Sequence, residues 1–357
     1  MRRYWYMNET ILTNRQKSAL NIISQSNGIS REDIQMLLEK VEPVSRPTLI
    51  RDLNVLLDKK LIQVEGRASS TRYFSTENNP FLRYFDLETY FKLDPDQRVR
   101  AKKSFDFDVL KHLKNLFSEV ELKEIRDISK SFSNKVSELS FDIYKNELER
   151  FVIELSWKSS KIEGNTYSLL ETEELIKRGV LAEGHSKDEV IMILNHKKAF
   201  DTILKNRDDF SQLSVSKVNQ LHNIIVQGLN INTGIRNEAV GITGTVYKPL
   251  DNKFQIEDVV RETLNIINDD KISLEKAFIA SVMFPYIQPY SDGNKRTSRM
   301  LVNAILVAGD NYPLSYRSVD IDEYKKALIL FYEQGSLFHV KKIFLEQVIF
   351  AYRNYFQ

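Results

Sequence analysis

The stretch "FPYIQPYSDGNKRTSRM", residues 284–300, gathers residue types suited to holding a polyphosphate. Gly293 interrupts the helical pattern and a new apolar periodicity follows from Asn294, so a helix is predicted to begin there. Its unpaired N–H groups and positive dipole end favour an anion, and the preceding Asp292 could hold a magnesium ion that bridges phosphates. The first turn and a half carries three cations that oppose the dipole unless an anion is bound: Lys295, Arg296 and Arg299. The competing interpretation is a basic turn on the surface.

Helices are the elements that must position this stretch. From about residue 106 onward, apolar residues recur at three- and four-residue spacing in the segments 109–117, 141–157, 190–204, 213–229, 256–268, 274–287, 295–309 and 322–334. The segment 233–252 differs, because it holds three of the 12 glycines and alternates Val, Ile and Tyr. We therefore predict a mostly α-helical bundle from which a β-hairpin projects at 233–252.

The N-terminal residues 1–76 follow a different plan. Thr13 and Gln16 have the form of a capping box, and Ser30 and Ser45 are placed to begin a second and a third helix. The run "LIQVEGRASSTRYF" then predicts a β-hairpin. Three helices followed by a hairpin are the order of a winged helix-turn-helix domain, an α+β module. Residues 77–105 are expected to be a connector with some helix.

A nucleic-acid partner is the favoured interpretation of this module. Residues 1–76 carry 12 Lys and Arg against 8 Asp and Glu, whereas the remainder is slightly acidic. The N-terminal turns of the third helix and the hairpin are the parts that would contact DNA. Their candidate contact residues are Ser45, Arg46, Thr48, Arg51, Arg67 and Arg72. The module resembles bacterial winged helix-turn-helix regulators, which read paired half-sites, so a homodimer is expected; the alternative is a protein–protein module.

Composition excludes several classes of site and location. The chain has no cysteine, so thiolate chemistry is absent, and its five histidines lack the close spacing of a zinc site. No run of 18 apolar residues occurs, so no membrane partner is expected. The basic N-terminus has no apolar core typical of a secretory signal. These features predict a cytoplasmic protein.

Several motifs resemble those of Fic-domain proteins. "QPYSDGNKRTSR" is similar to the family's HPFxDGNGRxxR, and it matches at Pro289, Asp292, Gly293, Asn294, Arg296 and Arg299. "SSKIEGN" resembles the family's inhibitory motif [S/T]xxxE[G/N], with Ser159, Glu163 and Gly164 in register. The segments "GIRNEAV" and "GTVYKP" resemble the family's flap, and "ILNHKKAF" at 193–200 also fits. The resemblance covers roughly residues 105–340.

The resemblance implies a helical Fic-like domain over 106–357 that binds ATP with magnesium and transfers AMP to a protein hydroxyl. It implies that Asp292 ligates magnesium, that Arg299 holds the γ-phosphate, and that the other phosphates contact Gly293, Asn294 and Arg296. An inhibitory helix near 142–164 would bring Glu163 into an ion pair with Arg299. A target segment would dock on the flap by strand addition at Thr245, Val246 and Tyr247.

Two positions depart from the family pattern. Gln288 stands where the family has the histidine that acts as general base, and an amide has no suitable pKa. Losing a general base costs about 10²–10⁴-fold in rate. Lys295 replaces the glycine of AMP-transferring members and resembles the Doc branch, whose lysine accompanies phosphate transfer. His222 lies on a predicted helix and could approach the loop only through the tertiary fold; packing within the bundle is the simpler role.

These observations leave three functional hypotheses. The favoured one is a regulator of transcription whose Fic-like domain binds a nucleotide without efficient turnover. The alternative is an autoinhibited protein adenylyltransferase, or a Doc-like phosphotransferase, acting on protein hydroxyls. An interaction scaffold that binds neither ATP nor DNA is the third.

Overall fold

The computed structural model describes residues 12–40, 42–67, 70–137 and 140–356. The chain divides into two compact units: the first contains residues up to 101 together with 329–342, and the second contains 102–328 and the residues after 342. These limits differ from the predicted boundaries at 76 and 105. The prediction that the N-terminus is no secretory signal falls mainly on residues 1–11, outside the described residues.

The first unit contains the three helices and the hairpin that the sequence predicts. They are α1 (Asn14–Ser24), α2 (Arg31–Glu39), α3 (Arg46–Asp58), β1 (Ile62–Glu65) and β2 (Arg72–Ser75). The capping box at the start of α1 is present, because Thr13 Oγ1 accepts from the Gln16 amide and Gln16 Oε1 accepts from the Thr13 amide. β1 and β2 pair antiparallel with Ile62 opposite Ser75. Leucine and isoleucine side chains from all three helices form one core with Ile62.

Residues 77–101 of the predicted connector belong to the first unit, where aromatic and basic side chains bind the 329–342 segment. It contains the 3₁₀ turns η3 (Pro80–Leu82) and η4 (Pro95–Gln97) and the short helix α4 (Leu87–Tyr90). Tyr90 donates a 2.7 Å hydrogen bond to the carboxylate of Glu333, and Arg98 binds the same carboxylate at 3.2 Å. Glu333 is fully buried, and these hydrogen bonds help to satisfy its carboxylate oxygens there.

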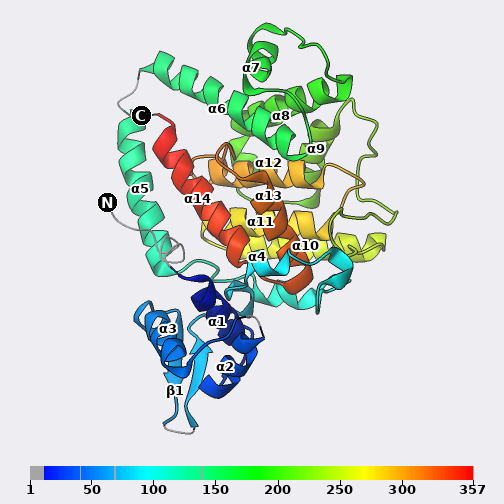
Figure 1. Ribbon diagram of the computed structural model, residues 1–357. Helices are drawn as coiled ribbons and strands as arrows, with labels where there is room; N and C mark the ends of the chain where they lie inside the picture. The colour runs from blue at the N-terminus through cyan, green and yellow to red at the C-terminus, as the bar shows by residue number, and fades with distance from the viewer. Residues whose placement is uncertain (1–11, 41, 68–69, 138–139, 357) are drawn as a thin grey trace. The chain divides into compact units, whose positions relative to one another are not determined.

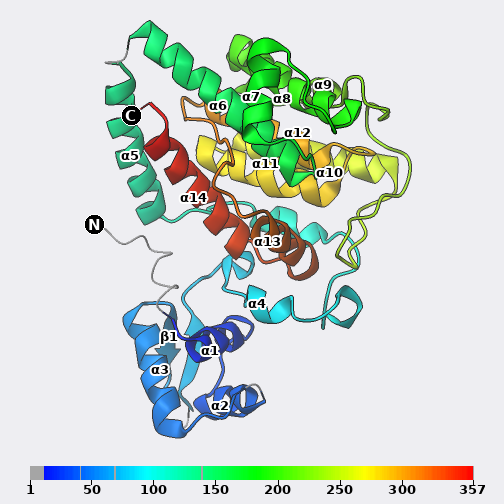
Figure 2. The ribbon, with the colours of Figure 1, turned by 45° about the horizontal axis from the view of Figure 1, so that its top comes forward.

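The second unit is a helical bundle. Its elements are η5 (Phe107–His112), α5 (Glu119–Ser137), α6 (Phe141–Ile162), α7 (Leu169–Arg178), α8 (Lys187–Lys205), η6 (Arg207–Phe210), α9 (Val215–Val226), α10 (Lys253–Asp269), α11 (Ser273–Ile287) and α12 (Asn294–Ala308). Two further helices, α13 (Ile321–Gln334) and α14 (Phe338–Asn354), are divided between the units. α11 and α12 pack along each other, and α12 also contacts α6, α8 and α9 (Figures 1 and 2). Nearly all side chains of α11 are buried, as expected for a helix that is apolar on nearly all sides.

Two predictions of local structure were wrong. Residues 233–252, all of which the structure describes, contain no strand and follow an irregular path in place of the expected hairpin. The segment 109–117 is not an α-helix; a 3₁₀ helix ends at His112. In the part of the chain that the structure describes, no helix is both long and apolar enough to cross a membrane.

Candidate active site

The loop between α11 and α12 has a backbone that only particular residues tolerate. α11 ends at Gln288 in the left-handed region with φ 50°, and Gly293 at the start of α12 has φ 81°. A Cβ atom on Gly293 would lie 2.9 Å from Val226 Cγ1 and 3.4 Å from His222 Nε2. Both the positive φ and the close approach of α9 therefore require glycine at this position.

His222 supports the loop from α9. Its Nε2 lies 3.0 Å from the carbonyl oxygen of Asp292, and its ring stacks on Tyr290 with centroids 3.7 Å apart. Tyr290 in turn donates to Asn219 on the same helix at 2.8 Å. Because a carbonyl only accepts, Nε2 carries the proton and is not available as a base. The fully buried His222 thus contacts the loop, and its Nε2 serves there to bind the loop backbone rather than to act as a base.

Gln288 is engaged inside the protein. Its Nε2 donates to the Pro285 carbonyl at 2.7 Å, and its Oε1 accepts from Asn294 Nδ2 at 2.8 Å. Asn294 also closes the loop on Tyr290, accepting from its amide and donating to its carbonyl, each at 2.8 Å. The Asn294 side chain is therefore committed to the loop, and what it offers a phosphate is its backbone N–H at the helix start.

The two arginines of α12 carry unused donors. Arg296 Nη2 donates to Asp292 Oδ2 at 3.0 Å, while the Nη1 atoms of Arg296 and Arg299 are buried and have no hydrogen-bond partner among the described residues. Burial lowers the pKa of Arg296. Buried guanidinium groups with free donors at a helix N-terminus fit a phosphate. Asp292 is two-thirds exposed, so its carboxylate is accessible to a cation, although the described residues hold no cluster of three acidic or histidine side chains.

The end of α6 delivers two of the three predicted inhibitory residues, Ser159 and Glu163, to Arg299. Arg299 Nη2 donates to Glu163 Oε1 at 2.8 Å and to the Ser159 carbonyl at 2.9 Å, and its Nε donates to Ser159 Oγ at 2.8 Å. Burial alone would raise the pKa of Glu163, but the charges of Arg299 and Lys295 outweigh it and lower that pKa. Gly164 follows directly with φ 98°, a backbone conformation that favours glycine.

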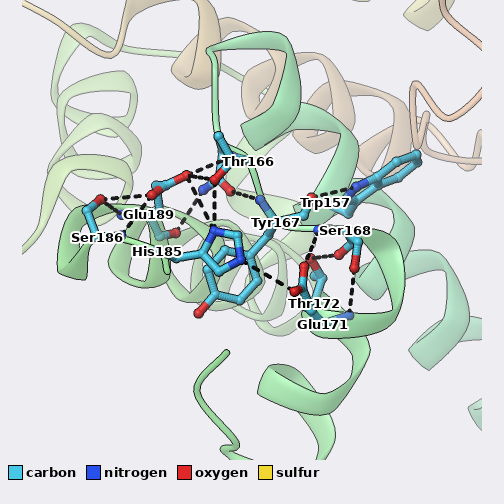
Figure 3. A network of polar contacts seen from close by, with 10 residues as sticks. Trp157, Thr166, Tyr167, Ser168, Glu171, Thr172, His185, Ser186 and Glu189 are labelled. Atoms are coloured by element: carbon cyan, nitrogen blue, oxygen red, sulfur yellow. Dashed lines mark hydrogen bonds and ion pairs between the residues drawn. The ribbon is translucent and has the colours of Figure 1, made fainter. Parts of the chain in front are cut away.

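A polar network, which the sequence reasoning did not predict, holds the residues after Gly164 (Figure 3). The Thr166 amide and hydroxyl donate to Glu189 Oε1 at 2.7 and 2.6 Å, and Thr166 Oγ1 also lies 2.8 Å from His185 Nδ1. The indole of Trp157 donates to the Tyr167 carbonyl at 3.1 Å. These contacts tie the end of α6 to the start of α8, which fixes where Glu163 emerges. The spacing Ser-x-x-Glu at 186–189 was the available signal, since it is a capping box.

The flap segment 233–252 is anchored by Arg236. Its Nε donates to the Gln288 carbonyl at 2.6 Å, its Nη1 donates to the Glu238 carbonyl at 2.6 Å, and its Nη2 donates to the Leu250 carbonyl. Tyr247 is buried, donates to the Tyr286 carbonyl at 2.9 Å and stacks on the Tyr286 ring. Tyr247 is therefore a core residue. Docking of a target segment at Thr245, Val246 and Tyr247 stays a prediction, and the first two of these residues are half-buried.

The candidate DNA-contacting residues lie in the first unit, and all of them are exposed except the half-buried Thr48. Arg46 and Arg51 are exposed on α3, and Arg67 and Arg72 are exposed in the hairpin. Ser45 precedes α3 without capping it; its hydroxyl lies 2.9 Å from Thr48 Oγ1. DNA binding stays a prediction for this set.

Comparison with known proteins gives a consistent result. Residues 212–306 match the Fic/DOC family. The chain is similar to the protein adenylyltransferase Fic of Aedes aegypti, with 28% identity over 189 residues, which cover 50% of this chain and 36% of that protein. It is also similar to a probable protein adenylyltransferase of Aquifex aeolicus, with 29% identity over 121 residues, covering 33% of this chain and 36% of that protein. The chain thus spans little more than a third of the length of these relatives.

Solved structures share the fold at low identity. A Fic domain-containing signalling protein from Bacteroides thetaiotaomicron aligns with a TM-score of 0.54 and 20% identity, covering 65% of this chain and 94% of that one. Fic-1 from C. elegans aligns with a TM-score of 0.57 and 16% identity, covering 96% of this chain and 97% of that one. At these identities the likeness concerns the fold alone.

Proposed function

Residues 212–306 form a Fic/DOC domain, and on that premise we propose that this chain is an ATP-dependent protein adenylyltransferase held in an autoinhibited state by Glu163. The observation that carries the proposal is the contact between Arg299 and the end of α6, where Ser159 and Glu163 supply three acceptors. The names of the similar proteins, which are protein adenylyltransferases, support the same activity.

The geometry suggests how a nucleotide would be held. The first-turn N–H groups of α12 and the free Nη1 of Arg296 would donate to the α- and β-phosphates. Asp292 would ligate a divalent cation, expected to be magnesium, which would neutralise phosphate charge. Arg299 is the residue left for a γ-phosphate, but Glu163 occupies one of its donors. ATP would then bind with its γ-phosphate displaced until α6 releases Arg299.

Gln288 limits the turnover that this site can reach. Its amide already donates to the Pro285 carbonyl and accepts from Asn294, and an amide has no pKa that would let it take the proton of an incoming hydroxyl. The expected rate is lower by about 10²–10⁴-fold than that of a site with a general base. Because Lys295 resembles the lysine of the Doc branch, phosphate transfer is the competing reaction. ATP labelled at the α- or the γ-phosphate distinguishes AMP transfer from phosphate transfer.

The test compares the wild type with Glu163→Gly, using ATP labelled at the α-phosphate or at the γ-phosphate. Release of Arg299 should raise incorporation of the α-label into protein by at least about tenfold. Glu183→Gly is the matched control, because Glu183 is an exposed carboxylate in the loop between α7 and α8. Incorporation of the γ-label alone would replace adenylylation by phosphotransfer. Failure of ATP to bind either protein in calorimetry would overturn the proposal altogether.

A second function, DNA binding by the first unit, is favoured by the exposed arginines of α3 and of the hairpin. With nucleotide binding in the second unit, it would make the chain a ligand-gated regulator of transcription. The test is a gel shift with DNA from its own promoter, with and without ATP, comparing the wild type with the double variant Arg46→Ala, Arg51→Ala. Lys59→Ala, beyond the C-terminal end of α3, is the control. Absence of binding at low salt in every case would reject this function, and footprint length would test the expected homodimer.

A further inference from the structure

His196 on α8 lies against the end of α6 and is fully buried. Its Nδ1 is 2.7 Å from the carbonyl oxygen of Met192, one turn earlier on α8, and its Nε2 is 2.8 Å from Ser159 Oγ. A carbonyl oxygen only accepts hydrogen bonds, so Nδ1 must carry the proton of the neutral ring. Nε2 then has a lone pair, and the Ser159 hydroxyl must donate to it.

Arg299 meets the same hydroxyl from the opposite side. A guanidinium only donates, and Arg299 Nε donates to Ser159 Oγ at 2.8 Å. The hydrogen bonds therefore run in one direction, from Arg299 to Ser159, from Ser159 to His196, and from His196 to Met192. Ser159 and Arg299 are as deeply buried as His196, so water does not compete for these groups. In such surroundings each hydrogen bond polarises the next one.

The direction of these hydrogen bonds requires a neutral His196 ring, and the ring stays neutral over a wide range of pH. Burial lowers the pKa of His196 to about 3, and the positive charge of Arg299 acts in the same direction. The imidazole is therefore neutral at neutral pH, where the Glu163 carboxylate pairs with Arg299.

We propose that His196 is a positioning residue of the inhibitory contact: by accepting from Ser159, it fixes the hydroxyl in the orientation that accepts from Arg299. This inference rests on the proposed function, in which release of Arg299 allows the γ-phosphate to bind. Without an acceptor at the Nε2 position, the serine hydroxyl turns to a carbonyl of the preceding helical turn, as buried helical serines do. Arg299 then loses part of one of its three contacts with α6 and is released more readily.

The first test measures ATP and ADP affinity by calorimetry on the intact chain. In the wild type the two should bind about equally, because Glu163 withholds Arg299 from the γ-phosphate. His196→Leu removes the acceptor and should favour ATP over ADP by about threefold to tenfold, the range for one hydrogen bond. His196→Gln places Oε1 near the position of Nε2 and should restore the wild-type ratio. An unchanged ratio in His196→Leu would overturn the proposal.

A double-mutant cycle tests whether His196 acts on Arg299 through Ser159. If His196 acts through Ser159, His196→Leu should add nothing to the change already caused by Ser159→Ala. Full additivity of the two changes would mean that His196 acts by another path and would overturn the proposal. If His196→Leu does not fold, His196→Asn serves in its place, because its shorter side chain keeps an amide donor near Nδ1 for the Met192 carbonyl but no acceptor near Nε2.

A third measurement does not depend on nucleotide. In protein labelled with ¹⁵N-arginine, the Nε–H signal of Arg299, assigned by its loss in Arg299→Lys, should be protected from hydrogen exchange. His196→Leu should weaken this protection, and His196→Gln should retain it. Because the signal is read without ATP, a chain that fails to bind ATP would refute the proposed function and still test this contact. Equal protection in all three proteins would contradict the role of His196.

Discussion

Arg236 Nε lies 2.6 Å from the carbonyl oxygen of Gln288, which joins the flap segment to the left-handed residue that ends α11. The Arg236 amide also donates to the Pro289 carbonyl at 3.0 Å. The remaining nitrogens of the guanidinium bind carbonyls within 233–252. One buried arginine thus replaces the strand pairing that the sequence predicted for this segment, and it couples the flap to the phosphate-binding loop.

Replacing Arg236 with lysine should therefore destabilise the second unit. An ammonium cannot reach three carbonyls in the fork geometry of a guanidinium, and carbonyls left unpaired in a buried site cost about 1–3 kcal/mol each. We expect a loss of about 2–4 kcal/mol in the free energy of unfolding. Urea unfolding followed by fluorescence of Trp157, which lies in the same unit, gives the measurement.

The control for this change is Arg261→Lys on α10. The Arg261 side chain is 62% exposed, and among the described residues its ion pairs are with Glu257 and Asp258 of the same helix, so its replacement should change stability little. Equal stability of Arg236→Lys and the wild type would show that the fork is not required.

Gly164 and Gly293 form a matched pair that separates backbone strain from steric contact as the reason for a glycine. Both have positive φ, but a Cβ on Gly164 would meet nothing within 4 Å, whereas one on Gly293 would meet Val226 at 2.9 Å. Gly164→Ala should cost only the backbone strain, about 1–3 kcal/mol. Gly293→Ala should cost about 1–3 kcal/mol more, because α9 must move. Urea unfolding of both variants measures the difference, and equal losses would exclude steric contact as the reason for glycine at 293.

Local signals in the sequence were sufficient where the structure depends on neighbouring residues. The capping box at Thr13 and the helix start at Asn294 could be predicted because each depends on residues within one turn. The residues that meet at Arg299 were predicted by motif resemblance, and the structure places Ser159 and Glu163 against it.

The rest depends on contacts between distant residues. The alternation of Val, Ile and Tyr in 233–252 indicated a hairpin, but Tyr247 uses its apolar ring to pack on Tyr286 and not across a strand pair. His222 reaches the loop through a contact 70 residues away in sequence, which no local pattern indicates. The bonding of the Gln288 amide to Asn294 and Pro285 likewise depends on the loop's closed shape.

Restoring a base at position 288 should test what limits the reaction. In the Glu163→Gly background, Gln288→His should raise incorporation of the α-label from ATP by about 10²–10⁴-fold. Histidine is among the residues that tolerate the left-handed backbone found here. The rate should also fall at acidic pH as the imidazole is protonated.

Gln288→Ala in the same background separates this effect from simple removal of the amide. It should lower stability, because Asn294 loses an acceptor, but leave the slow rate unchanged. A rate for Gln288→His no higher than that of Gln288→Ala would show that a missing base is not the limit.

The neutral state of buried His196 should make the folded chain sensitive to acid. Its pKa is lowered from the ordinary 6.5 to about 3, chiefly by burial, so the unfolded chain binds more protons between these values. Stability should therefore fall as pH falls through this window, by at most about 1.4 kcal/mol per pH unit from this one group. His196→Gln lacks the titrating ring and should show a shallower dependence, while His222 and His339 contribute equally to both proteins. Urea unfolding of the two proteins from about pH 7 to pH 4 measures the difference, and parallel curves would show that His196 becomes protonated without loss of the fold.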